Sequence, residues 1–303
     1  MEGPVPGTVP VVRRRRILRT FVFLALSVAG LIGLLAAVAL VGGERPLFGN
    51  SVAVVEIRGV IEDATETVEA LEHFRKNEAT VAVVVRIESP GGAVAPAQEL
   101  YEEVLRVREQ KPVVASLGTV AASGGYYVAA AANRILAAPG TITGSIGAIM
   151  SVPYYAPLAD KIGFSEESVK SGRFKDTGHP LRRLSAEERS LLQGMVDEVL
   201  GQFVDAIARG RNMPAGRVRA LADGRIYSGK QALEAGLIDQ LGGLEAATRV
   251  AWEEARQTGE PRVQRVKPRR LPRILQLLGE TLAGELPRFG GGLYFLYGGP
   301  VPE

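Results

Sequence analysis

The chain has 303 residues, of which 23% are charged and 46% are hydrophobic, a composition typical of a folded globular protein rather than a disordered one. Cysteine is absent, which excludes disulfides, thiolate catalysis and cysteine-bound metal centres. The two histidines, His73 and His179, are too few for a multi-histidine metal site, so we expect neither a metal nor a cofactor.

The positive charge is concentrated at the amino terminus. Residues 1–41 contain five arginines and one glutamate, a net charge of +4, so the total of +3 leaves −1 for residues 42–303. A nearly neutral body with a basic amino terminus is not expected to bind nucleic acid. The charge lies where a membrane protein would carry it.

Residues 21–41 contain no charged side chain and would span about 32 Å as a helix, enough to cross a hydrocarbon core of about 30 Å. Arginines precede this run, so the positive-inside rule keeps the amino terminus cytoplasmic and the rest of the chain outside. A cleaved secretory signal, ending near residues 37–39, is the alternative, although the apolar run is long for one. The sequence therefore predicts a basic cytoplasmic segment (1–16), a single-pass cell-membrane anchor (17–41), a linker (42–50), an extracytoplasmic domain (51–260) and a tail of uncertain structure (261–303).

The outer domain alternates β-branched runs with helical patterns, which predicts an α/β fold with a mostly parallel sheet covered on both faces. Strands are expected at 52–57, 81–87, 113–117, 134–137 and near 167–170, and helices at 65–76, 96–110, 120–132 and about 186–210. Ser185 and Glu188 form a capping box before the last helix. The residues that define its buried face are Leu191, Leu192, Met195, Val196, Val199, Phe203, Val204 and Ile207.

The first chemical motif is Ser89-Pro90-Gly91-Gly92, which follows a predicted strand and precedes a helix. Paired glycines allow backbone N–H groups to approach an anion closely, as an oxyanion hole requires. An ordinary turn between a strand and a helix is the alternative interpretation.

The second motif is AASGGYY at residues 121–127. Ser123 would begin a helix, and the glycines that follow leave its hydroxyl accessible, as a nucleophilic serine requires. Ala121 replaces the first glycine of G-x-S-x-G, so the motif is not the α/β-hydrolase pattern. A helix N-cap serine is the alternative.

A nucleophilic serine needs a base, and we expect both histidines to be structural rather than catalytic. Lysine can serve if burial lowers its pKa from about 10.4 towards neutrality. The chain has 29 arginines but seven lysines, and arginine cannot act as a base. Lys175, in the sequence SGRFKD, lies among glycines beside an aromatic residue and is the candidate; a solvated loop charge is the alternative.

Taken together, the motifs SPGG, AASGGYYVA, TGSIGAIM (143–150), SGRFKD and DGRIYSGKQALEAGLID resemble those of the short form of signal peptide peptidase A. That family consists of membrane-anchored serine peptidases with a Clp-protease/crotonase-like fold. The resemblance extends from about residue 52 to residue 243, with the motifs in the family's order and at similar spacing. The linker and the tail match less well, and no function is assigned to them.

The resemblance implies a Ser–Lys dyad, in which Ser123 is the nucleophile and Lys175, 52 residues later, is the general base. It also implies that Ser145 orients the lysine and that several copies assemble into a homo-oligomeric ring. The expected substrates are hydrophobic peptides, above all remnant signal peptides in the membrane. The implied oxyanion donors are Gly91 or Gly92, together with Gly124.

Three alternatives remain open at the level of sequence. A crotonase-like acyl-CoA enzyme shares the fold and would need a carboxylate base, for which Glu88 is the nearest candidate. A non-catalytic, ring-forming membrane scaffold would keep the fold without the activity. Within the peptidase class, a general quality-control protease competes with a dedicated signal-peptide scavenger.

Overall fold

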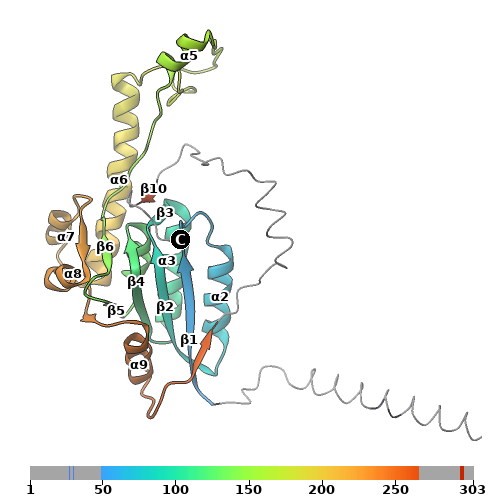
Figure 1. Ribbon diagram of the computed structural model, residues 1–303, viewed down its shortest axis with the longest axis vertical. Coiled ribbons are helices and arrows are strands. Elements are labelled where there is room, and N and C mark those ends of the chain that lie inside the picture. The colour runs from blue at the N-terminus through green and yellow to red at the C-terminus, as the bar shows by residue number, and fades with distance from the viewer. Residues whose placement is uncertain (1–26, 28–29, 31–48, 266–293, 297–303) are drawn as a thin grey trace, which may run out of the picture. The chain divides into compact units, whose positions relative to one another are not determined.

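Figure 1 shows the computed structural model of the chain, which describes residues 27, 30, 49–265 and 294–296. Almost all of the predicted membrane anchor and of the linker, and most of the tail, lie outside these residues. Within the described part of the chain, no helix combines the length and apolar character needed to cross a membrane. The described residues from Asn50 onwards belong to one compact unit.

A mostly parallel sheet lies at the centre of this unit. Its strands run in the order β7 (Ile226–Ser228), β6 (Ile142–Gly144), β4 (Val113–Ala122), β2 (Thr80–Ser89), β1 (Ser51–Arg58) and β9 (Val263–Arg265), while β5 (Arg134–Ala137) pairs with β4 and with β8 (Gln240–Leu241). Only the β6–β7 pair of this sheet is antiparallel among the described strands. The predicted α/β class with a mostly parallel sheet is confirmed.

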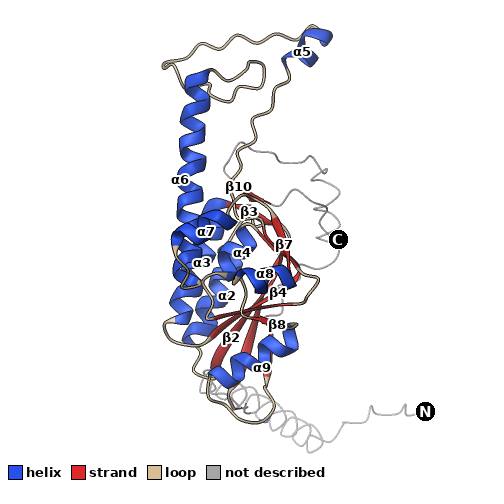
Figure 2. Ribbon diagram, turned by 90° about the vertical axis from the view of Figure 1, so that its left-hand side faces the viewer, coloured by secondary structure: helices blue, strands red, loops and turns tan. Residues whose placement is uncertain are grey.

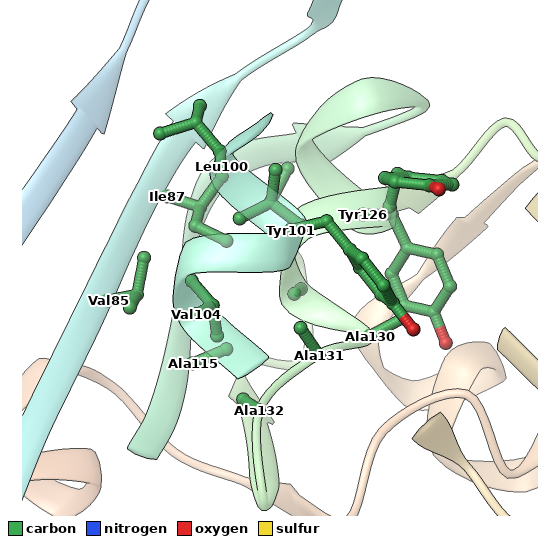
Figure 3. Close-up of a cluster of buried hydrophobic side chains, with 14 of the residues drawn as sticks. Val85, Ile87, Leu100, Tyr101, Val104, Ala115, Tyr126, Ala130, Ala131 and Ala132 are labelled. Carbon is green, nitrogen blue, oxygen red and sulfur yellow. The ribbon is translucent and has the colours of Figure 1, made fainter. Parts of the chain in front are cut away.

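Helices cover both faces of the sheet because its central strands are buried on both sides. Successive residues of β1, such as Val54 and Val55, lie on opposite faces of the sheet and belong to two different hydrophobic clusters. One cluster lies against α2 (Thr65–Lys76), α3 (Val94–Arg108), α4 (Gly124–Ala129) and the second half of α6 (Ala186–Gly210), and the other lies against α9 (Leu244–Glu254). Figure 3 shows part of the larger cluster, where Val85 and Ile87 of β2 meet Leu100 and Val104 of α3. Three short helices complete this part of the fold: α5 (Ala156–Ile162), α7 (Ala215–Leu221) and α8 (Gly229–Ala235).

Two expected elements differ from the sequence prediction. The helix expected over 120–132 begins only at Gly124, because residues 120–122 continue β4 and pair with β6. Alanine favours a helix locally, and the parallel ladder with β6 overrides this preference at Ala121 and Ala122. The strand expected near 167–170 is absent, and this stretch is irregular and exposed.

Helix α6 begins with the predicted capping box: Ser185 Oγ accepts the N–H of Glu188 at 3.1 Å, and the Glu188 carboxylate accepts the N–H of Ser185 at 2.8 Å. The predicted buried face is confirmed only in its second half, from Val199 onwards. In the first half, Leu191 is 48% exposed and Met195 is 43% exposed.

The first half of α6 is exposed because it projects from the sheet together with residues 151–184, which we call the arm. Figures 1 and 2 show the arm, with α5 at its tip, extending away from the sheet along α6. Many of its apolar side chains are exposed: Tyr154, Tyr155, Leu158, Ile162, Phe164 and Phe174. Within this single chain, the arm therefore has an apolar surface that nothing described covers.

Candidate active site

Ser123 lies at the turn between β4 and α4. Its φ of 52° and ψ of −117° place it in a conformation that residues other than glycine rarely adopt. Its N–H donates to the carbonyl of Gly144 at 2.8 Å, and its own carbonyl accepts the N–H of Tyr127 at 2.8 Å. The sheet and the first turn of α4 thus hold the strained backbone in place, as is common at functional sites.

The hydroxyl of Ser123 is buried and unpaired. The residue is 1% exposed, and Oγ has no hydrogen-bond partner among the described residues. A buried polar atom left unpaired costs about 1–3 kcal/mol, so it is retained where another group completes the site. Ser123 occupies the N-cap position of α4, but its side chain makes no capping hydrogen bond. The interpretation as a capping serine is therefore wrong.

Glycines bring α4 against the turn formed by residues 89–92, which we call the glycine turn. A Cβ at Gly125 would lie 3.0 Å from the carbonyl oxygen of Ser89, so the close approach of helix and turn depends on the missing side chain. Gly124, at the first position of α4, has an N–H with no acceptor inside the helix. This N–H directly follows the serine, as the oxyanion assignment requires.

The glycine turn leads into the short strand β3 (Gly91–Ala93), and Ile61 lies along one edge of it. Gly91 has a φ of 104° and donates its N–H to Ser89 Oγ at 3.1 Å. Ile61 donates to the carbonyl of Gly91 at 2.9 Å and accepts the N–H of Ala93 at 2.8 Å. Because backbone groups alternate between the two edges of a strand, the N–H of Gly92 points away from Ile61. Gly92 is therefore the better placed of the two glycines to donate to an oxyanion.

Ser145 lies next to Ser123 at the end of the neighbouring strand. In the β4–β6 ladder Ala122 pairs with Gly144, so Ser123 and Ser145 are the residues that directly follow these two neighbouring strands. Ser145 also has a positive φ, 50°, and its N–H donates to the carbonyl of Arg225 at 2.8 Å. The structure thus brings Ser123, Ser145 and the glycine turn to one end of the sheet.

Lys175 does not join this group within a single chain. It lies on the arm, is exposed, and its N–H donates to the carbonyl of Gly172 at 3.1 Å. Ser123 Oγ has no partner in the described residues, so Lys175 is not hydrogen-bonded to it here. Of the six predicted site residues, the fold assembles five and places the lysine elsewhere.

The residue after the lysine is held by an ionic cluster that the sequence analysis missed. Arg182 binds the carboxylate of Asp176 at 2.9 Å, and it also binds the carboxylate of Glu188 in the capping box of α6. These hydrogen bonds from Arg182 lower the pKa of Asp176, with Lys170 contributing, and lower the pKa of Glu188 to about 2. The cluster fixes the base of the Lys175 loop to the start of α6. In the sequence, Arg182 is one of two adjacent arginines in a charged loop, and nothing in that pattern indicated that it would hold Asp176 and Glu188 together.

The other titratable candidates are already engaged. His179, also on the arm, contacts Glu166 at 3.3 Å and accepts the N–H of Leu181 at 3.2 Å. Glu88 binds Arg86 at 3.1 Å and accepts the N–H of Thr119. Burial raises the pKa of Glu88, but these hydrogen bonds and the charge of Arg86 outweigh burial and lower it. A lowered pKa favours a structural carboxylate rather than the base of a crotonase-like enzyme.

We also searched the described residues for side chains that could bind a metal ion. In the described ranges, no group of three or more histidine, aspartate or glutamate side chains is arranged to hold a metal ion. The chemistry that the assembled residues can perform is acyl transfer to a serine with backbone stabilisation of an oxyanion.

Comparison with known proteins agrees with this chemistry. The chain is 43% identical over 200 residues to a protein of Synechocystis sp. named "Putative protease", covering 65% of this chain and 72% of that protein. It is 36% identical over 226 residues to the chloroplastic serine protease SPPA of Arabidopsis thaliana, covering 73% and 33% of the two chains. It is 34% identical over 218 residues to the "Putative signal peptide peptidase SppA" of Enterococcus faecium, covering 67% and 63%.

Residues 106–258 match the profile of peptidase family S49, and this region contains Ser123, Ser145, Lys175 and the arm. The match covers half of the chain and coincides with the part of the structure that holds the strained serine. Ser123 is buried beside a turn of paired glycines, and its hydroxyl has no hydrogen-bond partner among the described residues. The chain that carries it belongs to peptidase family S49.

Proposed function

We propose that the protein is a membrane-anchored serine endopeptidase that hydrolyses hydrophobic peptides outside the cytoplasm by a Ser–Lys dyad. The observation that carries this proposal is Ser123, whose strained backbone and buried, unpaired hydroxyl lie beside the glycine turn in a chain of a peptidase family. The hydroxyl is still able to donate a hydrogen bond, and a neutral lysine would accept it.

The reaction follows from these positions. Neutral Lys175 takes the hydroxyl proton as Ser123 Oγ attacks the carbonyl carbon of the scissile peptide bond. The N–H groups of Gly92 and Gly124 hold the developing oxyanion. The C–N bond then breaks, and the leaving amine takes the proton from Lys175. Water, deprotonated by the same lysine, hydrolyses the acyl-enzyme and releases the second product.

In our proposal, the lysine comes from a neighbouring copy of the chain. The arm that carries Lys175 projects from the sheet, and its exposed residues include Tyr155, Ile162 and Phe164. An arm of this kind buries its apolar side chains when it packs against another subunit, and that subunit's Ser123 then gains the base it lacks. Repetition of the same contact from copy to copy closes a ring.

The substrate class follows from the location. The uncharged run at 21–41, preceded by five arginines, supports an anchor that keeps the peptidase at the outer surface of the cell membrane. Remnant signal peptides are released in that membrane, and one of the relatives carries signal peptide peptidase in its name.

Cleavage of a synthetic signal peptide by the full chain in detergent, read by mass spectrometry, tests the proposal. Wild type should cut between apolar residues, and both Ser123→Ala and Lys175→Met should lose at least about 10³-fold in rate. Lys161→Met, an exposed lysine on α5, is the matched control and should cut like wild type. If all the variants cut alike, the dyad is wrong. If wild type assembles but cuts nothing, the scaffold interpretation replaces the peptidase.

A further inference from the structure

Residues 223–228, which we call the β7 segment, lie against the strand that leads to Ser145. They belong to the motif DGRIYSGKQALEAGLID, to which the proposed mechanism assigns no role. Strand β7 is an edge strand of the sheet and pairs antiparallel with β6, which ends at Gly144. Because β4 and β2 lie on the other side of β6, the β7 segment borders the candidate site opposite the glycine turn.

The ring of Tyr227 lies on Gly144. A Cβ at Gly144 would lie 2.4 Å from Cδ2 of the ring and 3.1 Å from Cε2, so the ring occupies the place that a side chain would fill. Gly144 has a φ of 76°, and its carbonyl accepts the N–H of Ser123 at 2.8 Å. Tyr227 is itself held, because it packs against the larger hydrophobic cluster and its hydroxyl donates to the carbonyl of Leu221 at 3.3 Å. The ring therefore restricts a residue that anchors the backbone of Ser123.

The same segment also anchors Ser145. The carbonyl of Arg225 accepts the N–H of Ser145 at 2.8 Å, and the N–H of Gly224 donates to the carbonyl of Ile146 at 3.1 Å. The guanidinium of Arg225 binds the carboxylate of Asp223 through Nε at 2.8 Å, and the same carboxylate accepts the N–H of Arg225 at 3.1 Å. These hydrogen bonds close the turn at one end of the segment and fix the direction of its carbonyl groups.

The other end of the segment is fixed by the start of α8. Ser228 and Gln231 form a capping box, in which Ser228 Oγ accepts the N–H of Gln231 at 3.2 Å and the Gln231 side chain accepts the N–H of Ser228 at 2.9 Å. A Cβ at Gly229 would lie 2.0 Å from the carbonyl oxygen of Ala138, so α8 packs directly on the backbone that precedes β6. Strand β7 is thus held at both ends, and it can restrain the strand beside it.

We infer that Tyr227 is a positioning residue for the nucleophile: its ring holds the Gly144 carbonyl in the direction that keeps Ser123 at positive φ. A residue in such a conformation is strained and persists only where its surroundings over-determine it. Gly144 alone does not supply this restraint, because glycine has the widest choice of backbone conformations. The effect of Tyr227 on the backbone is independent of the proposed function, and only its effect on the reaction rate rests on that function.

Loss of the ring should disturb two catalytic groups together. Without it, Gly144 rotates more freely and its hydrogen bond to Ser123 opens more often. The N–H of Gly124 directly follows Ser123, so it changes direction when the serine does. A misplacement of about 1 Å lowers a reaction rate by as much as about 10²-fold.

The backbone effect is measured by hydrogen exchange at the Ser123 amide of the full chain, read by mass spectrometry with fragmentation to single residues. Tyr227→Val removes the ring but suits a strand, and exchange at Ser123 should become at least about tenfold faster. Tyr227→Phe keeps the ring and loses only the hydrogen bond to Leu221, so it should exchange like wild type. Ile226→Ala, at the preceding position of β7 with a residue that is 43% exposed, is the matched control and should also exchange like wild type.

Two results would overturn the inference. One is unchanged exchange at Ser123 in Tyr227→Val. The other is an equal acceleration in residues 113–117, in the first half of β4, which would indicate a general loss of stability rather than a local one. Tyr227→Leu, which keeps more of the packing volume, is measured in parallel and decides the question if Tyr227→Val does not fold.

Cleavage of the synthetic signal peptide by the same chains gives the effect on rate. The kcat of Tyr227→Val should fall about 10- to 100-fold with KM nearly unchanged, while Tyr227→Phe should stay within about twofold of wild type. An equal loss in Tyr227→Phe would assign the effect to the hydroxyl and overturn the role of the ring. Faster exchange at Ser123 in Tyr227→Val, together with no cleavage by any chain including wild type, would keep the positioning of Ser123 and reject the peptidase.

Discussion

The two sides of the candidate site are built in opposite ways. The sheet side is buried and strained: Ser123 and Ser145 are at most 8% exposed and both have positive φ. The arm side is exposed, and it is held at its base by charged groups rather than by a hydrophobic core. Strain needs a rigid frame, and the parallel strands β4 and β6 supply one. The arm has no such frame within its own chain.

This difference links the proposed site to the assembly of several copies of the chain. Under the proposed mechanism, Ser123 lacks its base in the isolated chain, which is then inactive. Contact between copies would couple assembly to activity, because the surface that buries the arm would also deliver Lys175.

The largest effect should come from mixing two inactive chains. Ser123→Ala lacks the nucleophile and Lys175→Met lacks the base, and each alone should fall at least about 10³-fold in cleavage rate. If the arm serves a neighbour, co-assembled chains at equal amounts should recover about a quarter of the wild-type sites, since one interface in four then joins an intact serine to an intact lysine. The measurement is peptide cleavage after co-expression of the two chains.

A mixture that stays inactive would place both residues of the dyad in one chain and would remove the contrast between the two sides. The control for assembly is the size of the complex in each mixture, which should match that of wild type.

The sheet side is tested most sharply at Gly92. A Cβ there would lie 2.1 Å from the carbonyl oxygen of Ile61, so Gly92→Ala must shift β3 and its N–H. The loss of one oxyanion donor typically costs about 10²–10³ in kcat. Gly216→Ala, on α7 with open space around it, is the matched control and should be close to wild type. Full activity in Gly92→Ala would exclude Gly92 as a donor.

Much of this sheet side was predictable from sequence. The β-branched runs of β1 and β2 and the paired glycines are local signals. They placed the glycine turn correctly after a strand and Ser123 correctly at the start of a helix. The extension of β4 to Ala122 was not predictable, because it depends on pairing with β6, more than 20 residues away. The long-range partner decides such cases, and sequence periodicity does not report it.

The arm side was far less predictable. The apolar stripe of α6 is continuous in sequence, yet only its second half is buried in this chain, so periodicity indicated a buried face without indicating what covers it. Arg182 and Asp176 resembled ordinary surface charges, and only the folded loop brings them together. The pairing of β10 (Tyr294–Leu296) with β3 joins segments about 200 residues apart and had no local signal.

A smaller effect is expected from loosening the base of the arm. Arg182→Met leaves the carboxylates of Asp176 and Glu188 without their shared partner. Lys175 should then be positioned less well, and kcat should fall about 10- to 100-fold with KM nearly unchanged, because Arg182 acts on the arm and not on the glycine turn. Arg173→Met, which breaks an exposed pair with Glu187 on the same arm, is the control and should change kcat less than about twofold. An equal loss in both variants would show that Arg182 has no special positioning role.

The smallest effect concerns pH and the order of the arm. Hydrogen bonds from Arg182 lower the pKa of Asp176 and bring that of Glu188 to about 2, so both carboxylates bind protons less readily in the folded arm than in an unfolded one. Their contribution to the stability of the arm is thus complete above pH about 5 and is lost as the pH falls from about 4 towards 2. Hydrogen exchange in residues 170–185, corrected for the intrinsic pH dependence, should be constant from pH 9 to pH 5 and rise below pH 4. Arg182→Met should flatten this rise. A change in exchange between pH 6 and pH 9 would instead mean that a group other than these carboxylates orders the arm.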